Sequence, residues 1–151
     1  MNTNEKDIQD IKKFFNSYSK GFSSIYTEDD QSRSMFNKLM DKWFRKAVYR
    51  RYEITLSETQ KDSISTVLDV GCGPGHHTVA FLNQGKVVTA LDVADEMVDL
   101  TKEKVQKFDE NASCSYIVSD YMTHQFDEQF DAICVMGFFD YVSDPVTVLK
   151  K

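Results

Sequence analysis

The stretch VLDVGCGPGHHT, from Val67 to Thr78, constrains the fold of this chain more than any other. A short run of strand type enters a turn with glycines at Gly71, Gly73 and Gly75, and a helical pattern follows directly. Glycines at a strand-to-helix turn let a ligand approach the backbone where a side chain would collide. The stretch therefore predicts a strand, a ligand-binding turn and a helix.

The segments after this turn alternate between strand and helix patterns. Strands are predicted at residues 66–70, 86–91, 115–118 and 131–136, and helices at about 76–83, at 95–108 and from Pro145 onward. Asp95 is placed to cap the second of these helices, and Asp144 the last. The strand at 131–136 is apolar enough to be buried on both faces. This alternation predicts an α/β fold, a Rossmann-like parallel sheet of about four strands with flanking helices.

The chain before the first strand has helical patterns. Apolar residues at three- and four-residue steps predict an amphipathic helix from Asp7 to Lys20 and a second one that starts near Ser32 or Ser34. The basic face of the second helix is interpreted as a solvated surface in preference to a patch for an anionic substrate. Residues 53–65 are interpreted as a fraying helix end and a polar linker. We expect residues 1–63 to form a helical cap segment and residues 64–151 to form the core, within a single domain.

Composition excludes several classes of protein. A chain of 151 residues is long enough for one domain and too short for two ordinary ones. The net charge of -6 argues against a generic nucleic-acid binder, because such a surface must neutralise phosphates. No apolar run approaches the roughly 18 residues of a membrane span, and the polar N-terminus does not resemble a signal peptide. We expect a cytoplasmic protein.

Neither the cysteines nor the histidines have the spacing of a metal site. The odd count of cysteines is interpreted as buried thiols in a reducing compartment, at Cys72, Cys114 and Cys134. No carboxylate set completes a site around the histidines, which are expected at the surface or near helix caps, at His76, His77 and His124. No metal is expected.

The spacing of the glycines separates two classes of ligand. A dinucleotide site requires G-x-G-x-x-G, whose third glycine permits close packing of helix and strand. Counted from Gly71, that position holds His76, which disfavours an NAD-type site. The chain instead has D-x-G-x-G-x-G from Asp69 to Gly75. This stretch, LDVGCGPG, resembles motif I of the class I S-adenosylmethionine-dependent methyltransferases.

Three later stretches resemble further motifs of that family in the right order. LDVADEMV places Asp92 where the family has an acidic residue that binds both ribose hydroxyls. VSDYMT places Asp120 where an aspartate accepts from the adenine amino group, and the next backbone N–H, here that of Tyr121, reaches a ring nitrogen. VMGFFDYVSDP places Met136 and Gly137 where the backbone lines the methionine end of the cofactor. The resemblance covers Val67 to the C-terminus.

The resemblance implies S-adenosylmethionine as cofactor and S-adenosylhomocysteine as product. Met97 is a candidate for the adenine pocket, although a methionine on a helix is more often part of the core. The residues expected to bind the cofactor are Asp69, Gly71, Cys72, Gly73, Gly75, Asp92, Val93, Met97, Asp120, Tyr121, Met136 and Gly137.

The chemistry of methyl transfer requires little from the protein beyond positioning. The nucleophile must lie in line with the methyl group, away from water, and an oxygen nucleophile also needs a general base. The stretch FFDYVSDP has no histidine, so Asp140 and Tyr141 are the candidates for contact with the substrate, with purely structural roles as the alternative. The stretch also lacks the Asn/Asp-Pro-Pro-Tyr/Phe-like motif of nucleic-acid amino-methylating enzymes, and no three-cysteine cluster of radical enzymes is present. A small-molecule acceptor remains by elimination.

The length of the chain departs from the family pattern. Full family members have seven strands, whereas this sequence stops at Lys151, near the helix after the fourth strand. We therefore expect a truncated form of a longer enzyme, in which the fourth strand, ICVM, is an exposed apolar edge. In isolation we expect it either to form a homodimer through this edge or to have little catalytic activity.

The sequence leaves three functions open. The first is a methyltransferase that acts on an unidentified small-molecule acceptor. The second is a module that binds S-adenosylmethionine with weak or no catalysis. The third, disfavoured by His76, is an NAD-type dinucleotide-binding protein.

Overall fold

The computed structural model describes residues 9, 12–14, 35–136, 138–142 and 144–151. The elements in chain order are α2 (Met35–Thr59), β1 (Thr66–Val70), α3 (His76–Asn83), β2 (Val87–Asp92), α4 (Asp95–Phe108), β3 (Cys114–Val118), β4 (Ala132–Val135), the 3-10 helix η2 (Phe138–Tyr141) and α5 (Pro145–Leu149). The helix predicted at 7–20 and the start predicted for α2 fall largely outside the described residues. None of the described helices combines the length and the apolarity that a membrane crossing needs.

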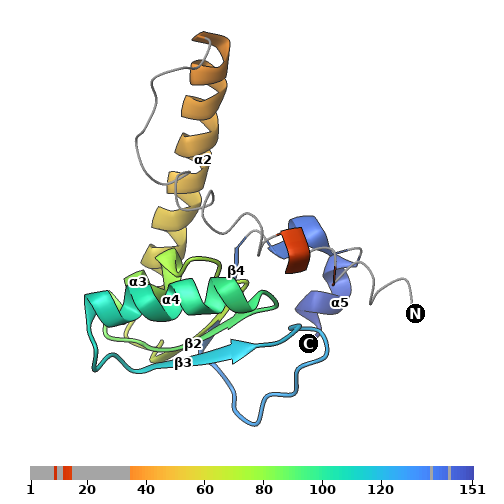
Figure 1. The fold of residues 1–151 in the computed structure, drawn as a ribbon. Helices are drawn as coiled ribbons and strands as arrows, with labels where there is room; N and C mark the ends of the chain where they lie inside the picture. The colour runs from red at the N-terminus through yellow and green to blue at the C-terminus, as the bar shows by residue number, and fades with distance from the viewer. Residues whose placement is uncertain (1–8, 10–11, 15–34, 137, 143) are drawn as a thin grey trace.

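The described strands form one parallel sheet with the order β3-β2-β1-β4. Figure 1 shows α3 and α4 lying side by side over one face of this sheet. Each helix connects two neighbouring parallel strands, as a crossover connection requires. The predicted α/β fold with a Rossmann-like parallel sheet of four strands is therefore confirmed.

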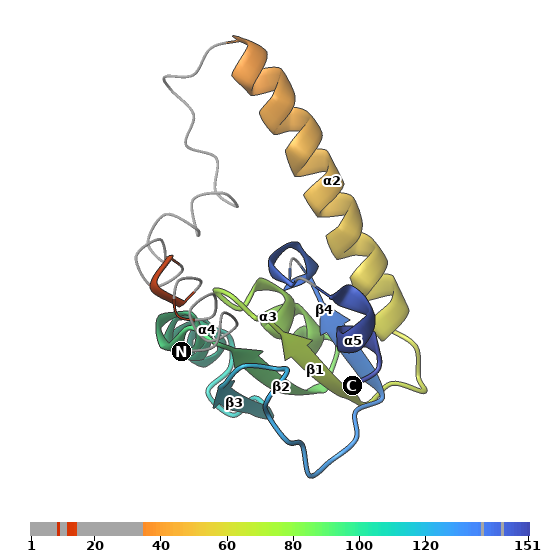
Figure 2. The ribbon, with the colours of Figure 1, turned by 90° about the vertical axis from the view of Figure 1, so that its right-hand side faces the viewer.

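Alternate residues of the strands build a core on each face of the sheet. Val67 and Val88 point to the helix face and pack with Phe81 of α3, all fully buried. Leu68 and Leu91 point to the opposite face, where aromatic residues of the segments after β3 and β4 and Val148 of α5 cover them. Figure 2 shows α5 on the side of the sheet away from α4. Both faces are thus covered near the carboxyl ends of the strands.

Strand β4 lies at an end of the described sheet, beside β1 alone. Cys134 is buried, but Ile133 on the opposite face is 49% exposed. The prediction that this strand is buried on both faces is therefore wrong. The aromatic side chains cover the half of that face that lies near the carboxyl ends of the strands. Val87, which is 51% exposed, and Ile133 lie in the uncovered half, near the amino ends.

Two helix ends differ from the predictions. Helix α2 continues to Thr59 instead of fraying from Glu53, because Gln84 after α3 binds its last turn: the Gln84 amide donates to the Leu56 carbonyl (2.9 Å) and accepts from the Thr59 hydroxyl (2.8 Å). Figures 1 and 2 show this end of α2 beside the sheet domain while the rest of the helix extends away from it.

The cap predicted for α4 is also wrong. Asp95 is the first residue of the helix, Ala94 is the N-cap, and no side chain of the cap residue bonds to the first turn. The carboxylate of Asp92 accepts from the Ala94 N–H instead (3.0 Å). By contrast, Asp144 caps α5 as predicted, since its carboxylate accepts from the N–H groups of Val146 and Thr147.

Candidate ligand site at the carboxyl edge of the sheet

The turn after β1 is held in place by the end of β2. The N–H groups of Gly71 and Cys72 both donate to the carbonyl of Leu91, at 2.8 and 3.0 Å. Gly71, Gly73 and Gly75 all have positive φ angles, of 70°, 52° and 76°, which side-chain-bearing residues rarely adopt. The turn therefore needs glycine at these positions for its backbone path alone.

The space around the glycines shows which part of the turn is open. A Cβ placed on Gly73 would have no atom of the described residues within 4 Å apart from its chain neighbours, whereas one on Gly75 would lie 2.9 to 3.1 Å from atoms of Thr101. Gly75 therefore serves the packing of α3 against α4. Gly73 is the point at which a ligand can reach the backbone of the turn.

Asp69 lies beneath the turn and not at its open side. It is 2% exposed, and its carboxylate accepts a hydrogen bond from the Thr78 hydroxyl of α3 (2.7 Å). Burial raises the pKa of Asp69 to about 6, the charge of Asp92 adds to this shift, and the Thr78 bond opposes it. The structure thus gives Asp69 the contacts of a residue that joins strand β1 to helix α3.

Asp92 ends β2 next to the turn. One carboxylate oxygen accepts from the Gly73 N–H and the other from the Ala94 N–H, both at 3.0 Å. Burial raises the pKa of Asp92, and the backbone bonds from Ala94, Gly73 and Val93 oppose this shift. Each oxygen retains acceptor capacity for one further donor. Asp92 as a whole is only 8% exposed.

The segment after β3 adds a second acidic residue to this edge. The Ser119 N–H donates to the Asp92 carbonyl (3.0 Å), and the partly exposed Asp120 accepts from the Met122 N–H (3.0 Å). The ring of Tyr121 is buried against Phe138 of η2, with ring centroids 5.9 Å apart. Of Asp120 and Tyr121, Asp120 is therefore the one whose side chain is accessible to a ligand.

Helix α2 contacts the end of β4 at the same edge. The Thr55 hydroxyl of α2 lies 3.7 Å from the sulfur of Met136, which is partly buried. Phe138 lies over the turn, 3.8 Å from the position of a Cβ on Gly71. Gly137 and the side chains of Asp140 and Tyr141 lie outside the described part of the chain, so their predicted roles stay predictions.

Because the strand order is β3-β2-β1-β4, these groups follow one another along the edge as Asp120, Asp92, the glycine turn and Met136. The chain passes from β1 to β2 and β3 on one side, and then crosses back so that β4 pairs with the other side of β1. The strand order therefore reverses at β1, which makes this the topological switch point where open α/β sheets bind ligands. The arrangement suits one elongated ligand with hydroxyl or amino donors at the β3 end.

Three further predicted site residues have side chains that are buried or partly buried. Met97 is 1% exposed within the core and Val93 is partly buried. The thiol of Cys72 is buried, and burial raises its pKa. Sequence reasoning missed Thr101, which is fully buried and donates to the Gly73 carbonyl (2.8 Å), and Phe138 over the turn. A threonine within the apolar stripe of α4 was the available signal, because a buried hydroxyl requires a partner.

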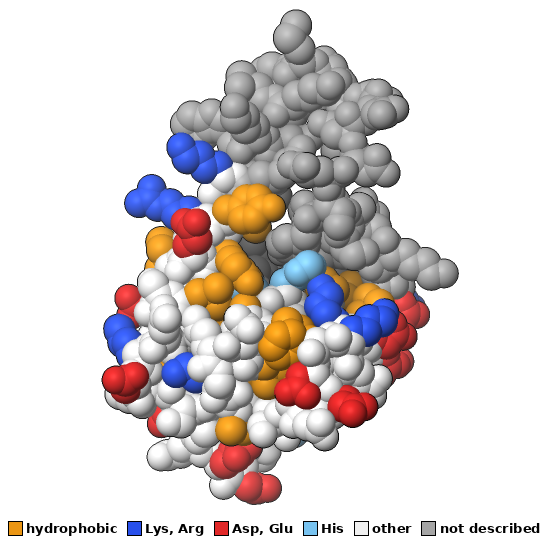
Figure 3. Space-filling view, turned by 90° about the vertical axis from the view of Figure 1, so that its left-hand side faces the viewer, with side chains coloured by type: hydrophobic (Ala, Val, Ile, Leu, Met, Phe, Trp, Pro, Cys, Tyr) orange, Lys and Arg blue, Asp and Glu red, His pale blue; other side chains and the backbone are white. Residues whose placement is uncertain are grey.

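A cavity of about 610 Å³ lies apart from this edge, between α2, α3 and α4. Its lining includes His76, whose ring nitrogens lie 3.2 and 3.3 Å from the Lys104 ammonium. Burial, followed by the charge of Lys104, lowers the pKa of His76 to about 4. Figure 3 shows this side of the molecule, with histidine and basic side chains beside hydrophobic ones.

His77 is the second residue of α3 and lies near the N-cap of that helix, one of the two predicted alternatives. Its ring contacts the rings of Tyr52 and Phe81, with centroids 5.1 and 6.1 Å away. Burial lowers the pKa of His77, and its Nε2 atom is buried without a hydrogen-bond partner among the residues that the structure describes. Among the described residues, no three His, Cys, Asp or Glu side chains gather as a metal site would require. The three cysteines are free thiols.

Comparison with known proteins identifies the core. Residues 67–151 match the family model described as a methyltransferase domain. The chain is 34% identical over 87 residues to a probable cobalt-precorrin-6B C(15)-methyltransferase (decarboxylating) of Thermoplasma acidophilum, covering 56% of this chain and 43% of that protein. It is 32% identical over 86 residues to a ubiquinone biosynthesis O-methyltransferase of Coxiella burnetii, covering 56% and 36%. The chain thus spans less than half of the length of these relatives.

A solved structure resembles the fold over a longer part of the chain. Magnesium protoporphyrin IX methyltransferase from Synechocystis PCC 6803, solved with bound SAM, superposes with a TM-score of 0.62 at 18% identity. The match covers 84% of this chain and 60% of that one. At this identity the likeness shows the fold.

Proposed function

Since the chain belongs to the methyltransferase domain family, which its residues 67–151 match, we propose that its carboxyl edge binds S-adenosylmethionine and that the protein transfers the methyl group to a small-molecule acceptor. The order of the groups along the edge is the observation that carries this proposal. Asp120 accepts from the adenine amino group and Asp92 accepts from the ribose hydroxyls. The glycine turn and the backbone at Met136 and Gly137 line the methionine part.

The described residues fit such a ligand. Gly73 leaves the backbone of the turn open on the side where a Cβ would stand. The Asp92 carboxylate is oriented by two backbone N–H groups and keeps acceptor capacity for two hydroxyl donors. A carboxylate that is already desolvated and fixed loses little freedom when the ligand binds. These features support a nucleoside at the β2 end of the site.

When bound, S-adenosylmethionine supplies a methyl group attached to a sulfonium centre, and the rest of the cofactor leaves as a neutral thioether. The residues of the chain then have to orient the two reactants and exclude water. Phe138 over Gly71 and Tyr121 against Phe138 form an apolar wall beside the turn, which suits the exclusion of water. Asp140 and Tyr141 of η2, which directly follows the β4 end of the site, remain the residues proposed to contact the acceptor.

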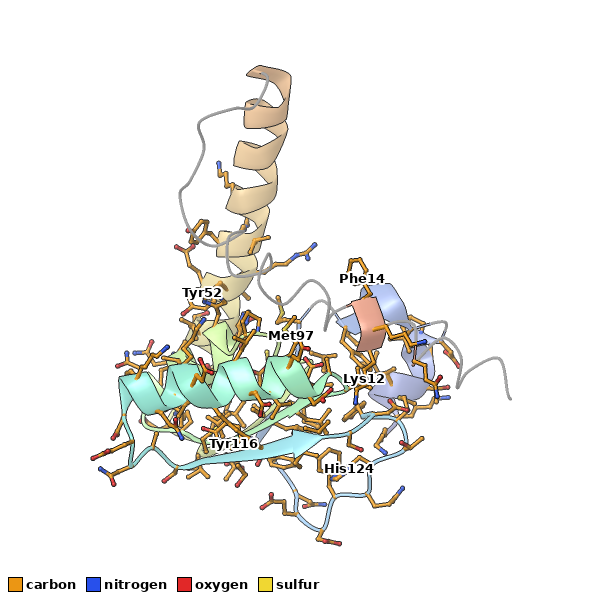
Figure 4. All side chains as sticks on the ribbon, viewed as in Figure 1. Lys12, Phe14, Tyr52, Met97, Tyr116 and His124 are labelled. Carbon is orange, nitrogen blue, oxygen red and sulfur yellow. The ribbon has the colours of Figure 1, made fainter. Side chains whose placement is uncertain are left out.

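We propose that residues 1–63 cap the site and that residues 64–151 form the cofactor-binding core. The ammonium of Lys12 pairs with the Asp95 carboxylate at 3.1 Å, which supports a cap at the beginning of α4 (Figure 4). The two curated relatives are named for methylation in cobalt-precorrin and ubiquinone biosynthesis, and these names support an acceptor of small-molecule size.

Calorimetry tests the cofactor and a transfer assay tests the reaction. S-adenosylhomocysteine should bind the chain, whereas NAD should not. Radiolabelled S-adenosylmethionine should then label one member of a panel of small molecules that carry hydroxyl, amino or carboxyl groups. Absence of S-adenosylhomocysteine binding would overturn the proposed site. Binding without transfer to any acceptor would instead support a cofactor-binding module.

A further inference from the structure

We propose that Thr101 of α4 is a positioning residue for the cofactor site, where its hydroxyl holds the Gly73 peptide in the geometry that the ligand meets. This inference rests on the proposed function. Thr101 is 0% exposed, so it does not touch a ligand itself. It acts through the glycine turn, 28 residues earlier in the chain.

The hydrogen bonds around Gly73 form a closed ring. The Thr101 hydroxyl donates to the Gly73 carbonyl at 2.8 Å, and the Gly73 N–H donates to one oxygen of Asp92 at 3.0 Å. The other oxygen of Asp92 accepts from Ala94, the N-cap of the helix that carries Thr101. Both polar groups of one glycine are therefore tied to α4, directly through Thr101 and indirectly through Asp92.

This ring matters because packing constrains Gly73 less than it constrains Gly71 or Gly75. In the described part of the chain, no atom beyond its two chain neighbours lies within 4 Å of its Cβ position, so among these residues hydrogen bonds and not side-chain contacts select its φ of 52°. A glycine without such bonds populates many conformations, and a ligand would have to order it on binding. The hydroxyl of Thr101 makes this selection before the ligand arrives, and it fixes the distance between the turn and the Asp92 carboxylate.

Thr101 also fills the space above Gly75, so its size and its hydroxyl must be separated experimentally. A Cβ on Gly75 would lie 2.9 Å from the hydroxyl oxygen and 3.0 Å from the methyl group. Thr101→Val keeps the shape and removes the donor, whereas Thr101→Ser keeps the donor and removes the methyl group. If packing alone mattered, Thr101→Val would be the harmless substitution of the two.

Calorimetric titration of the chain with S-adenosylhomocysteine tests the inference. Thr101→Val should weaken binding by about tenfold, the value of one lost hydrogen bond, and Thr101→Ser should bind close to the wild-type affinity. Thr101→Ala carries the same expectation as Thr101→Val and replaces it if that variant does not fold. Thr59→Val is the matched control, because it removes a buried hydroxyl whose bonds lie at the end of α2, and its affinity should not change.

A second measurement reports the turn without a ligand. Exchange of the Gly73 amide hydrogen, followed by NMR, should accelerate in Thr101→Val and not in Thr101→Ser or Thr59→Val. Equal affinities and equal exchange in wild type and Thr101→Val would overturn the positioning role while leaving the proposed function intact. A wild-type chain that does not bind S-adenosylhomocysteine would overturn both.

Discussion

The glycine turn has an inner side and an open side, and each side has its own aspartate. On the inner side Asp69 bonds to a threonine hydroxyl of α3, and Gly75 packs against Thr101. On the open side Asp92 bonds to two backbone N–H groups, and Gly73 has no neighbour at its Cβ position. The two carboxylates point to the same face of neighbouring strands, yet only Asp92 stands at the end of its strand.

The difference shows that residue type and burial do not assign a role by themselves. Both aspartates are less than 10% exposed, and burial raises the pKa of both. Their hydrogen-bond partners separate them: the inner carboxylate joins elements of the core, and the outer one is oriented toward the edge by the main chain. We therefore expect changes on the inner side to affect stability and changes on the open side to affect ligand binding.

The largest effect is expected for Gly75→Ala. A Cβ there meets Thr101 at 2.9 to 3.1 Å, including its backbone Cα, and φ is 76°. Together, the strain and the clash should lower the free energy of unfolding by about 2–5 kcal/mol in a chemical denaturation experiment. Gly73→Ala is the matched control, because it has the same type of φ and no clash, and it should cost only about 1–2 kcal/mol. Equal losses in the two variants would remove the distinction between the two sides.

The next effect concerns the open side. Asp92→Ala should weaken S-adenosylhomocysteine binding by about 1–3 kcal/mol, because the ligand's donors and the Gly73 N–H lose their acceptor. Calorimetry measures this loss. Asp99→Ala removes the same charge from the exposed face of α4 and serves as the control for net charge. Unchanged affinity in Asp92→Ala would show that the ribose does not bind at this carboxylate.

The sequence predicted the elements of the sheet domain well, because each strand is a short apolar run between turn residues. Boundaries that depend on distant contacts were missed. The bonds that hold the end of α2 come from Gln84, which follows α3, and β2 continues to Asp92 because that residue pairs with Val118 of β3. Neither partner is visible in the local pattern of residues.

For the site, motif spacing located the glycine turn, Asp92 and Asp120. It did not separate the inner role of Asp69 from the open role of Asp92, since both are acidic residues near strand ends. The sequence did not assign Thr101 to the site. Its contact with Gly73 depends on how closely α4 approaches the turn, which a single sequence does not specify.

The last expected effect examines the inner side alone: it is the pH dependence of Asp69→Asn. The pKa of Asp69 in the folded chain is raised to about 6, above the value near 3.9 of an unfolded aspartate. The protonated carboxyl thus stabilises the folded state fully below about pH 4, and this contribution is lost as the pH rises through about 6. The loss amounts to about 2–3 kcal/mol.

Asparagine has no charge to lose, so Asp69→Asn should gain stability relative to wild type between about pH 4 and pH 7. The difference between the two unfolding curves reports this carboxyl together with its coupling to Asp92, since His76 and His77 change their charge in both chains alike. Their lowered pKa values act in the opposite direction, because protonation below about pH 6.5 favours the unfolded chain. Parallel stability profiles for wild type and Asp69→Asn would mean that Asp69 is ionised without penalty. In that case the protonation of the inner carboxyl would contribute nothing to the difference between the two sides of the turn.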